Sequence, residues 1–225
     1  MLADRFGIRI TGMLDAWIKA LAGRFVVFDG PDGSGKTTQF QRFAAATREA
    51  GIAVCEVREP GGTIIGERIR QILLDPALDM MDVRCEMMLY MASRSQLVAE
   101  RVRPARQRGQ LVLADRFISS TLAYQGAAGG VPPADILAVG NVAIGDDQPD
   151  LVLIFDVDPD TAAHRLNPLL DRIEQRGSDY HARVRQGFLD QAEQDPTRHV
   201  VVDARDDIET VFQRTRDAIR ARLTT

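Results

Sequence analysis

The sequence predicts an α/β fold of three layers, with a five-stranded parallel sheet between two layers of helices. Short apolar runs recur along the chain, longer stretches of helical periodicity separate them, and no linker interrupts the pattern. The runs that we interpret as strands are residues 24–29, 52–57, 110–115, 150–157 and 199–203. Almost every residue in each run is apolar, which is typical of strands buried on both faces of a parallel sheet.

Helices are expected between these strands and after the last one. The helical patterns cover residues 36–50, 63–74, 82–108, 133–144, 159–166, 179–193 and 208–223. Glycine and proline mark several joints, at residues 60–62, 129–130 and 132–133. Crossovers between the parallel strands are expected to be right-handed. We expect residues 24–225 to form one domain.

The first 23 residues predict a separate amphipathic helical extension. The apolar residues of residues 1–23 that share one helix face are Met13, Leu14, Trp17, Ile18 and Leu21. The stretch lacks the long apolar core of a secretory signal, and its two aspartates are unusual for a transit peptide. We expect the helix to pack on this chain or on a dimer partner. A surface anchor and a misassigned start are the alternatives.

Composition excludes several classes of protein. Apolar residues make up 45% and charged residues 27% of the 225 residues, which excludes intrinsic disorder and collagen-like sequence. The formal net charge of -4 gives no overall attraction to nucleic acid, so no such partner is expected.

Cys55 and Cys85 have no paired spacing, which favours reduced thiols, and the three histidines form no metal-binding pattern. No apolar run is long enough to span a membrane, and we expect a cytoplasmic protein.

Residues 30–37, Gly-Pro-Asp-Gly-Ser-Gly-Lys-Thr, match the P-loop pattern G-x-x-x-x-G-K-[ST] between a strand and a helix. The glycines let successive N–H groups turn toward phosphate oxygens. Lys36 would meet the β- and γ-phosphates of ATP, and Thr37 would hold Mg²⁺. A glycine-rich turn without a ligand is the alternative. The predicted ATP-binding residues are Gly30, Asp32, Gly33, Ser34, Gly35, Lys36, Thr37 and Thr38.

A P-loop alone does not define the reaction. The Asn-Lys-x-Asp segment expected of guanine-binding GTPases does not occur in the sequence. Transfer to a small phosphate acceptor would instead require cationic and aromatic residues across the sheet from the P-loop.

Five segments of the chain together resemble the thymidylate kinase family. They are residues 30–38, 58–63 (Arg-Glu-Pro-Gly-Gly-Thr), 90–94 (Tyr-Met-Ala-Ser-Arg), 115–126 (from Asp-Arg-Phe to Ala-Tyr-Gln-Gly) and 171–174 (Asp-Arg-Ile-Glu). In order and spacing the resemblance covers residues 24 to about 203. It implies transfer of the γ-phosphoryl group of ATP to dTMP, with Mg²⁺ as cofactor and a homodimer as the assembly.

The resemblance implies a group of residues around the acceptor phosphate. Asp32 would approach the 3′-hydroxyl of the acceptor and its Mg²⁺, and Glu59 would lie on the acceptor and metal side. Arg116 would clamp the acceptor phosphate with its forked donors, and Arg70 would contact that phosphate or its surroundings. A turn residue at position 32, a solvent-exposed Arg70 and a structural Asp115–Arg116 pair are the alternatives. The predicted metal-binding residues are Thr37, Asp32 and Asp115.

A second group would hold the nucleoside. Tyr90 and Arg94 are four residues apart and share a helix face, and the resemblance implies that Tyr90 stacks on thymine while Arg94 faces its O4. A core tyrosine beside a surface arginine is the alternative. The resemblance assigns Thr121 to the thymine edge and Tyr124 to C2′ of the sugar, where a ring would exclude a ribose hydroxyl. Gln125 is an adjacent candidate.

Residues 164–172 resemble a short lid. In family members with glycine at the position of Gly33, an arginine of this lid closes over the phosphates. Arg165 matches the first lid arginine and Arg172 is retained, but residues 166–168 are Leu, Asn and Pro. We expect Arg165 to reach the phosphates, with a surface charge at a helix end as the alternative. The predicted catalytic residues are Lys36, Arg116, Arg165 and Asp32.

Two other functions remain open at this point. One is another P-loop nucleoside or nucleotide kinase with a different small acceptor. The other is a P-loop protein that binds nucleotide as a switch without turnover, which the short lid would favour.

Overall fold

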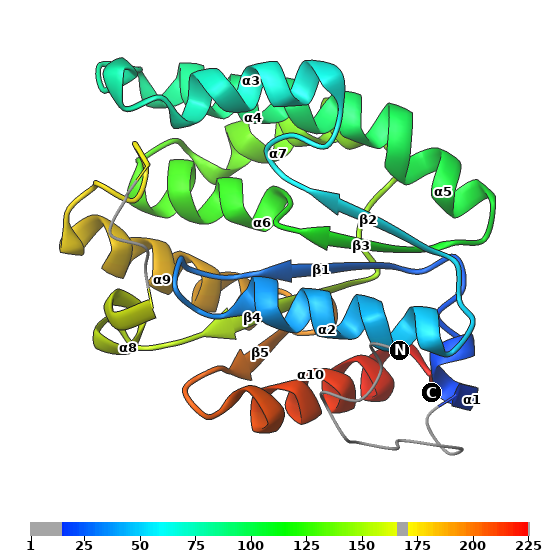
Figure 1. The fold of residues 1–225 in the computed structure, drawn as a ribbon. Coiled ribbons are helices and arrows are strands. Elements are labelled where there is room, and N and C mark those ends of the chain that lie inside the picture. The colour runs from blue at the N-terminus through cyan, green and yellow to red at the C-terminus, as the bar shows by residue number, and fades with distance from the viewer. Residues whose placement is uncertain (1–14, 166–170, 225) are drawn as a thin grey trace, which may run out of the picture.

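Five parallel strands form one sheet in the order β2-β3-β1-β4-β5 (Figure 1). The computed structural model describes residues 15–165 and 171–224. The strands are β1 (Phe25–Asp29), β2 (Val54–Arg58), β3 (Leu111–Asp115), β4 (Leu151–Asp156) and β5 (His199–Asp203). The predicted α/β class and all five strands are therefore confirmed. The three inner strands are almost fully buried, whereas the edge strands β2 and β5 are only partly so, because each has one hydrogen-bonded neighbour.

Helices cover both faces of the sheet (Figure 1). The longer ones are α2 (Lys36–Glu49), α3 (Ile64–Leu74), α4 (Val83–Leu97), α7 (Pro133–Ile144), α9 (Ser178–Gln194) and α10 (Ile208–Leu223). The shorter ones are α1 (Asp15–Lys19), η1 (Pro76–Leu78), η2 (Val98–Val102), α5 (Arg103–Gln107), α6 (Ile118–Thr121), η3 (Leu122–Ala128) and α8 (Pro159–Arg165). Helices α2 and α10 pack on one face, and α4, α7 and α9 lie on the other, where α3 packs on α4.

Successive residues of the inner strands enter different cores. In β1, Phe25 and Val27 join the core under η2, η3 and α9, while Val26 and Phe28 join the core under α2 and α10. This alternation follows from the two-residue repeat of a strand, and it explains why the run is apolar throughout.

The predicted helix over residues 82–108 is helical along nearly all its length but is not a single regular helix. Regular α4 gives way at Val98 to the wider π-helical turn of η2, and α5 follows. Pro104 has no N–H to donate to the preceding turn, which is a physical reason for the irregularity.

Residues near the N-terminus pack on the α2 side of the sheet. Trp17, Ile18 and Leu21 are 9%, 2% and 0% exposed, and they join the same core as Phe43 of α2. Met13 and Leu14, also assigned to the apolar face of the expected extension, lie outside the described residues.

The fold brings three strand ends together. Strands β2, β3 and β1 are neighbours in the sheet, and their carboxyl ends carry Arg58, Asp115 and Asp29. Ligands collect at this edge of open parallel sheets. Within the described ranges, no helix combines the length and apolar character needed to cross a membrane.

Candidate active site

The P-loop joins the end of β1 to the start of α2, as the sequence predicts. Gly35 caps α2 with a φ of 81°, and Gly33 has a φ of 76°, both in the left-handed region that favours glycine. A Cβ atom on Gly33 would lie 2.4 Å from the backbone oxygen of Ala162 in α8. Helix α8 can therefore contact the loop only because residue 33 has no side chain. The unsatisfied N–H groups and positive dipole end of α2 favour an anion here.

Two clefts meet at the P-loop and share Lys36 and Thr37. The larger, about 510 Å³, lies over the loop and the start of α10, and Arg165 lines it. The predicted ATP-binding residues in its wall are Gly33, Ser34, Gly35, Lys36, Thr37 and Thr38. Gly30 and Asp32 are not in this wall. Asp32 lines the other cleft, and the Gly30 carbonyl accepts a hydrogen bond of 3.1 Å from Arg116 Nη1.

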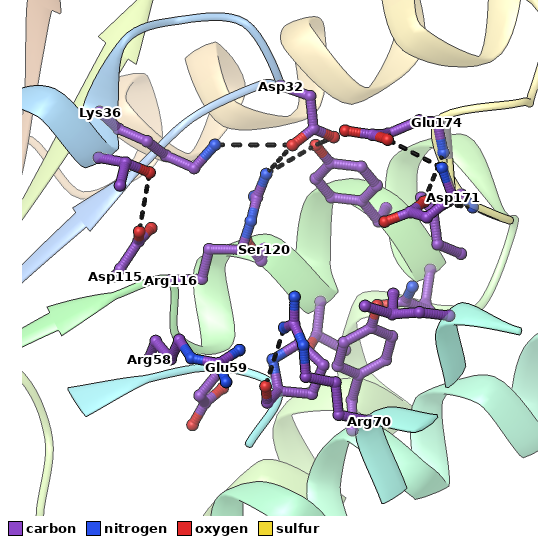
Figure 2. Close-up of a pocket in the computed structure, with 18 residues that line it drawn as sticks. Asp32, Lys36, Arg58, Glu59, Arg70, Asp115, Arg116, Ser120, Asp171 and Glu174 are labelled. Carbon is purple, nitrogen blue, oxygen red and sulfur yellow. Dashed lines mark hydrogen bonds and ion pairs between the residues drawn. The ribbon is translucent and has the colours of Figure 1, made fainter. Parts of the chain in front are cut away.

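The smaller cleft, about 240 Å³, contains nearly all of the predicted acceptor site (Figure 2). The predicted residues that line it are Asp32, Glu59, Arg70, Tyr90, Arg116, Thr121, Tyr124 and Gln125. In Figure 2, Lys36 and Arg116 extend toward Asp32 at one end, and Arg58, Glu59 and Arg70 lie at the other. Arg94 is not among the lining residues.

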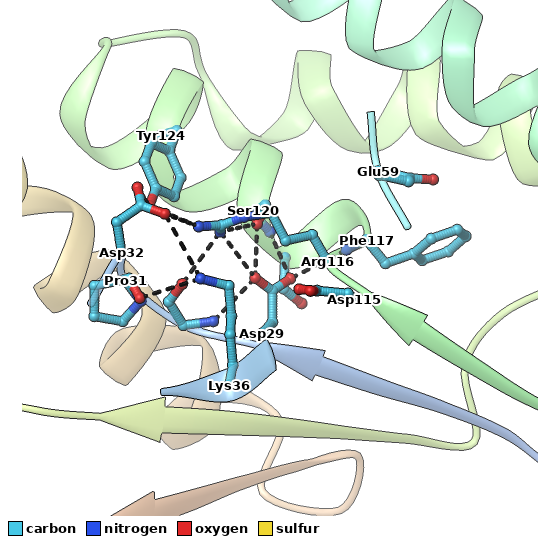
Figure 3. Close-up of polar contacts among 12 residues, drawn as sticks. Asp29, Pro31, Asp32, Lys36, Glu59, Asp115, Arg116, Phe117, Ser120 and Tyr124 are labelled. Atoms are coloured by element: carbon cyan, nitrogen blue, oxygen red, sulfur yellow. Dashed lines mark hydrogen bonds and ion pairs between the residues drawn. The ribbon is translucent and has the colours of Figure 1, made fainter. Parts of the chain in front are cut away.

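Arg116, Asp32 and Tyr124 form a compact polar cluster at the P-loop end (Figure 3). Arg116 Nη2 donates to Asp32 and, at 3.3 Å, to the Tyr124 hydroxyl, which in turn donates to Asp32 Oδ2 at 2.7 Å. Lys36 Nζ lies 3.6 Å from Asp32 Oδ1. Arg116 has a φ of 72°, in the left-handed region that only glycine adopts readily. The dense set of contacts holds this strained backbone in place.

Charges in the cluster shift one another's pKa values. Burial favours a raised pKa for Asp32, but Arg116 and Lys36 outweigh it and hold the pKa well below its usual range. Burial lowers the pKa of Lys36, and Arg116 lowers it further. Burial also raises the pKa of Tyr124 well above its usual value. Asp32 is therefore a carboxylate and Tyr124 a neutral donor at neutral pH.

Thr37 and Asp115 are the residues best suited to Mg²⁺. Thr37 Oγ1 donates to Asp115 Oδ2 at 3.0 Å; Thr37 lines both clefts and Asp115 lines the smaller one. A hydroxyl and a carboxylate are oxygen ligands of the kind that Mg²⁺ prefers beside phosphate oxygens. Asp32, the third predicted ligand, already has Arg116, Lys36 and Tyr124 as partners. Among the residues that the structure describes, no group of three or more His, Cys, Asp or Glu side chains is arranged to bind a metal.

Arg94 has a different environment from the one its spacing suggests. Although it shares α4 with Tyr90, it is 1% exposed and pairs with Glu59 Oε2 through Nε at 2.8 Å and Nη2 at 2.6 Å. Its Nη2 also donates to Thr121 Oγ1 at 3.1 Å. Burial raises the pKa of Glu59 to about 7, even though Arg94 opposes the shift. In this structure Arg94 supports two residues of the cleft wall from behind.

The expected lid arginines have different partners. Arg165 donates to the backbone oxygens of Ala204 at 3.0 Å and Arg205 at 3.3 Å, beside the P-loop. Arg172 is 5% exposed and donates to Glu86 of α4 and to the backbone oxygen of Leu73. The Leu166, Asn167 and Pro168 positions of the expected lid lie outside the described residues.

Sequence reasoning missed some polar residues at the site. Asp29 is fully buried and accepts hydrogen bonds from Gly30 N, Phe117 N and both N and Oγ of Ser120, while Arg116 Nη1 lies 3.5 Å away (Figure 3). Its position at a strand end, the signal that selected Asp115, could have found it. Asp171 and Glu174 also line the smaller cleft and belong to the Asp-Arg-Ile-Glu segment (Figure 2).

A P-loop shared between two clefts, one of them rich in arginine and aromatic side chains, defines a phosphotransferase that moves a phosphoryl group between nucleotides. Comparison with known proteins specifies the family. Residues 28–215 match the family model described as Thymidylate kinase. The chain belongs to the thymidylate kinase family.

Individual relatives of known sequence or structure belong to the same family. A thymidylate kinase from Deinococcus radiodurans is 46% identical over 186 residues, which is 81% of this chain and 89% of that protein. One from Pseudomonas fluorescens is 43% identical, covering 86% of this chain and 93% of the relative. The crystal structure of thymidylate kinase from Ehrlichia chaffeensis superposes with a TM-score of 0.72 at 31% identity, over 88% of this chain and 98% of that one.

Proposed function

We propose that this chain transfers the γ-phosphoryl group of ATP to dTMP and releases dTDP and ADP. The observation that carries the proposal is the position of Lys36 in the walls of both clefts, within 3.6 Å of Asp32. A lysine there can neutralise charge on the group that passes from one cleft to the other.

The chain's own residues have distinct tasks in this proposal. The P-loop amides and Lys36 bind the donor phosphates, and Arg116 binds the acceptor phosphate and aligns its oxygen with the γ-phosphorus. As that oxygen bonds to phosphorus, the bond to the β–γ bridging oxygen breaks and ADP leaves. Arg165, which lines the donor cleft, neutralises charge on the transferring group. Asp32 holds Arg116 and Tyr124 in place from the P-loop side.

The remaining residues of the acceptor cleft recognise the base and the sugar of the nucleoside. Tyr90 stacks on the base, Thr121 and Gln125 lie toward its edge with Arg94 behind Thr121, and Tyr124 excludes a ribose hydroxyl. Glu59 and Arg70 bound the side of the cleft opposite the P-loop (Figure 2). Mg²⁺, held by Thr37 and Asp115 with Asp32 nearby, would neutralise charge on the donor phosphates.

Two further properties are part of the proposal. A homodimer is supported by exposed apolar side chains on adjacent helices: Ile65 and Ile72 of α3 are 52% and 44% exposed, and Met88 of α4 is 54% exposed. A cytoplasmic location is supported by Cys55 and Cys85, which are both free thiols.

An assay of ADP release tests the function. With ATP and Mg²⁺ present, turnover should be fast with dTMP and slower with dUMP, dCMP and thymidine. A preference for thymidine or another acceptor would favour a different P-loop kinase. ATP consumption that stays flat on addition of dTMP would favour a nucleotide-binding switch.

A further inference from the structure

Glu86 is a buried carboxylate to which the reaction assigns no task. It lies on α4, is fully buried, and receives donors from two distant segments. Its Oε1 accepts from Gln125 Nε2 at 2.7 Å, and its Oε2 accepts from Arg172 Nη2 at 2.5 Å and Arg176 Nη2 at 2.7 Å. Burying a carboxylate costs desolvation free energy, which its partners offset only in part, and this cost suggests that Glu86 has a role beyond stability.

The contact with Glu86 determines which way the amide of Gln125 points. A carboxylate between two guanidinium groups offers only acceptors, so the amide must present its NH₂ group. A flipped amide would set two oxygen atoms against each other at 2.7 Å. Gln125 is 1% exposed and lines the acceptor cleft, so the amide has little freedom to turn elsewhere. With the nitrogen held by Glu86, the carbonyl oxygen is the end that remains for a ligand.

The two arginines hold Glu86 itself in place. Arg172 Nε donates to the backbone oxygen of Leu73 at 2.9 Å, and Arg176 Nη1 donates to the Tyr180 hydroxyl at 2.6 Å. Both guanidinium groups are therefore fixed at a second point. Glu86 cannot rotate away from Gln125 without breaking these contacts as well.

We infer that Glu86 is a positioning residue for base selection: it orients the amide of Gln125 so that a carbonyl oxygen faces the acceptor base. The inference rests on the proposed function. A carbonyl oxygen accepts a hydrogen bond from the ring N–H at N3 of thymine or uracil. In cytosine N3 is itself an acceptor, so the same oxygen repels it.

The test measures selectivity, because a purely structural residue would change rate or stability without changing it. In Glu86→Gln, either amide can turn, and Gln125 can present its NH₂ group to the cleft. The ratio of kcat/KM for dTMP to that for dCMP should fall by about tenfold or more, with dCMP gaining in absolute terms. The matched control is Glu100→Gln, at an exposed glutamate of η2, which should keep the wild-type ratio.

A double-mutant cycle shows whether Glu86 acts through Gln125. Gln125→Leu alone should lower the dTMP-to-dCMP ratio, and adding Glu86→Gln should lower it no further. A folded Glu86→Gln variant with the wild-type ratio, or one whose effect is equally large in the Gln125→Leu background, would overturn the inference.

A measurement on the unmodified protein covers the case in which Glu86→Gln does not fold. The side-chain NH₂ protons of Gln125 should exchange slowly with solvent both before and after dTMP binds, because Glu86 holds them in each case. Rapid exchange in either state would overturn the inference. Wild-type enzyme without activity on dTMP would instead refute the proposed function, so the two failures are distinguishable.

Discussion

Replacing Arg116 with methionine removes the guanidinium group from the centre of the polar cluster and keeps an unbranched side chain that fills the space of its aliphatic part. Position 116 then still carries a non-glycine residue at a φ of 72°, so backbone strain is nearly the same in both proteins. The change therefore isolates the contribution of the charge and its hydrogen bonds.

The structure gives the expected magnitude. Asp32 keeps Lys36 at 3.6 Å and the Tyr124 hydroxyl, while Asp29 loses the guanidinium that lies 3.5 Å from it. Two charges about 4 Å apart interact by about 4 kcal/mol at an effective dielectric constant of about 20. Asp29 is fully buried, but Arg116 and Asp32 are only partly buried, so the loss should lie below the roughly 3–5 kcal/mol of a fully buried pair and lower the melting temperature of a chain of this size by about 5–10 °C. Because the acceptor phosphate also loses its clamp, kcat/KM for dTMP should fall by about 10³-fold or more.

Thermal denaturation without ligands and steady-state kinetics measure the two effects. KM for ATP should change much less than kcat/KM for dTMP, since the donor cleft keeps its P-loop. The matched variant Asp32→Asn, combined with Arg116→Met, should be more stable than the sum of the single effects predicts, because neither charge is then left without the other. Additive stabilities, or an Arg116→Met enzyme with near wild-type kcat/KM, would refute the reasoning.

Two further predictions concern stability. Glu59 has its pKa raised from 4.5 to about 7 in the folded protein, so its contribution to stability is present below about pH 4.5 and is lost as the pH rises through 7. Glu59→Gln should remove about 3 kcal/mol of this pH dependence in denaturant titrations from pH 5 to 8, and an unchanged slope would contradict it. Trp17→Ala should lower the free energy of unfolding by about 3–5 kcal/mol, because Trp17 packs with its ring centroid 6.4 Å from that of Phe43. Its kcat/KM should not change, since α1 lies at the opposite end of the strands from the clefts (Figure 1), and a large loss of activity would contradict that separation.

The strands and the P-loop could be predicted because their signals are local. A strand buried on two faces is apolar throughout, and a phosphate loop is a short pattern between a strand and a helix. Both signals lie within about ten consecutive residues. The π-helical turn at residues 98–102 was not predicted, because the apolar periodicity of residues 82–108 is also compatible with one regular helix. Pro104 alone does not show where such a helix becomes irregular.

Side-chain partners were harder to predict because they are distant in the sequence. The i,i+4 spacing correctly places Tyr90 and Arg94 on one helix, but nothing in it indicates that Arg94 pairs with Glu59, 35 residues earlier. Glu86 meets Gln125 across 39 residues and Arg172 across 86. Pairings of this kind depend on how the elements of the whole domain pack, so they cannot be predicted from local sequence patterns alone.

The contact between Gly33 and α8 affects how substitutions in the P-loop should be interpreted. Even a methyl group at position 33 would overlap the backbone at Ala162 and push away the helix that ends at Arg165. An inactive Gly33→Ala enzyme would thus combine two defects, a distorted anion site and a misplaced arginine. Kinetic data from that position cannot be assigned to phosphate binding alone, and Ser34 is a better position for isolating the loop's own contribution.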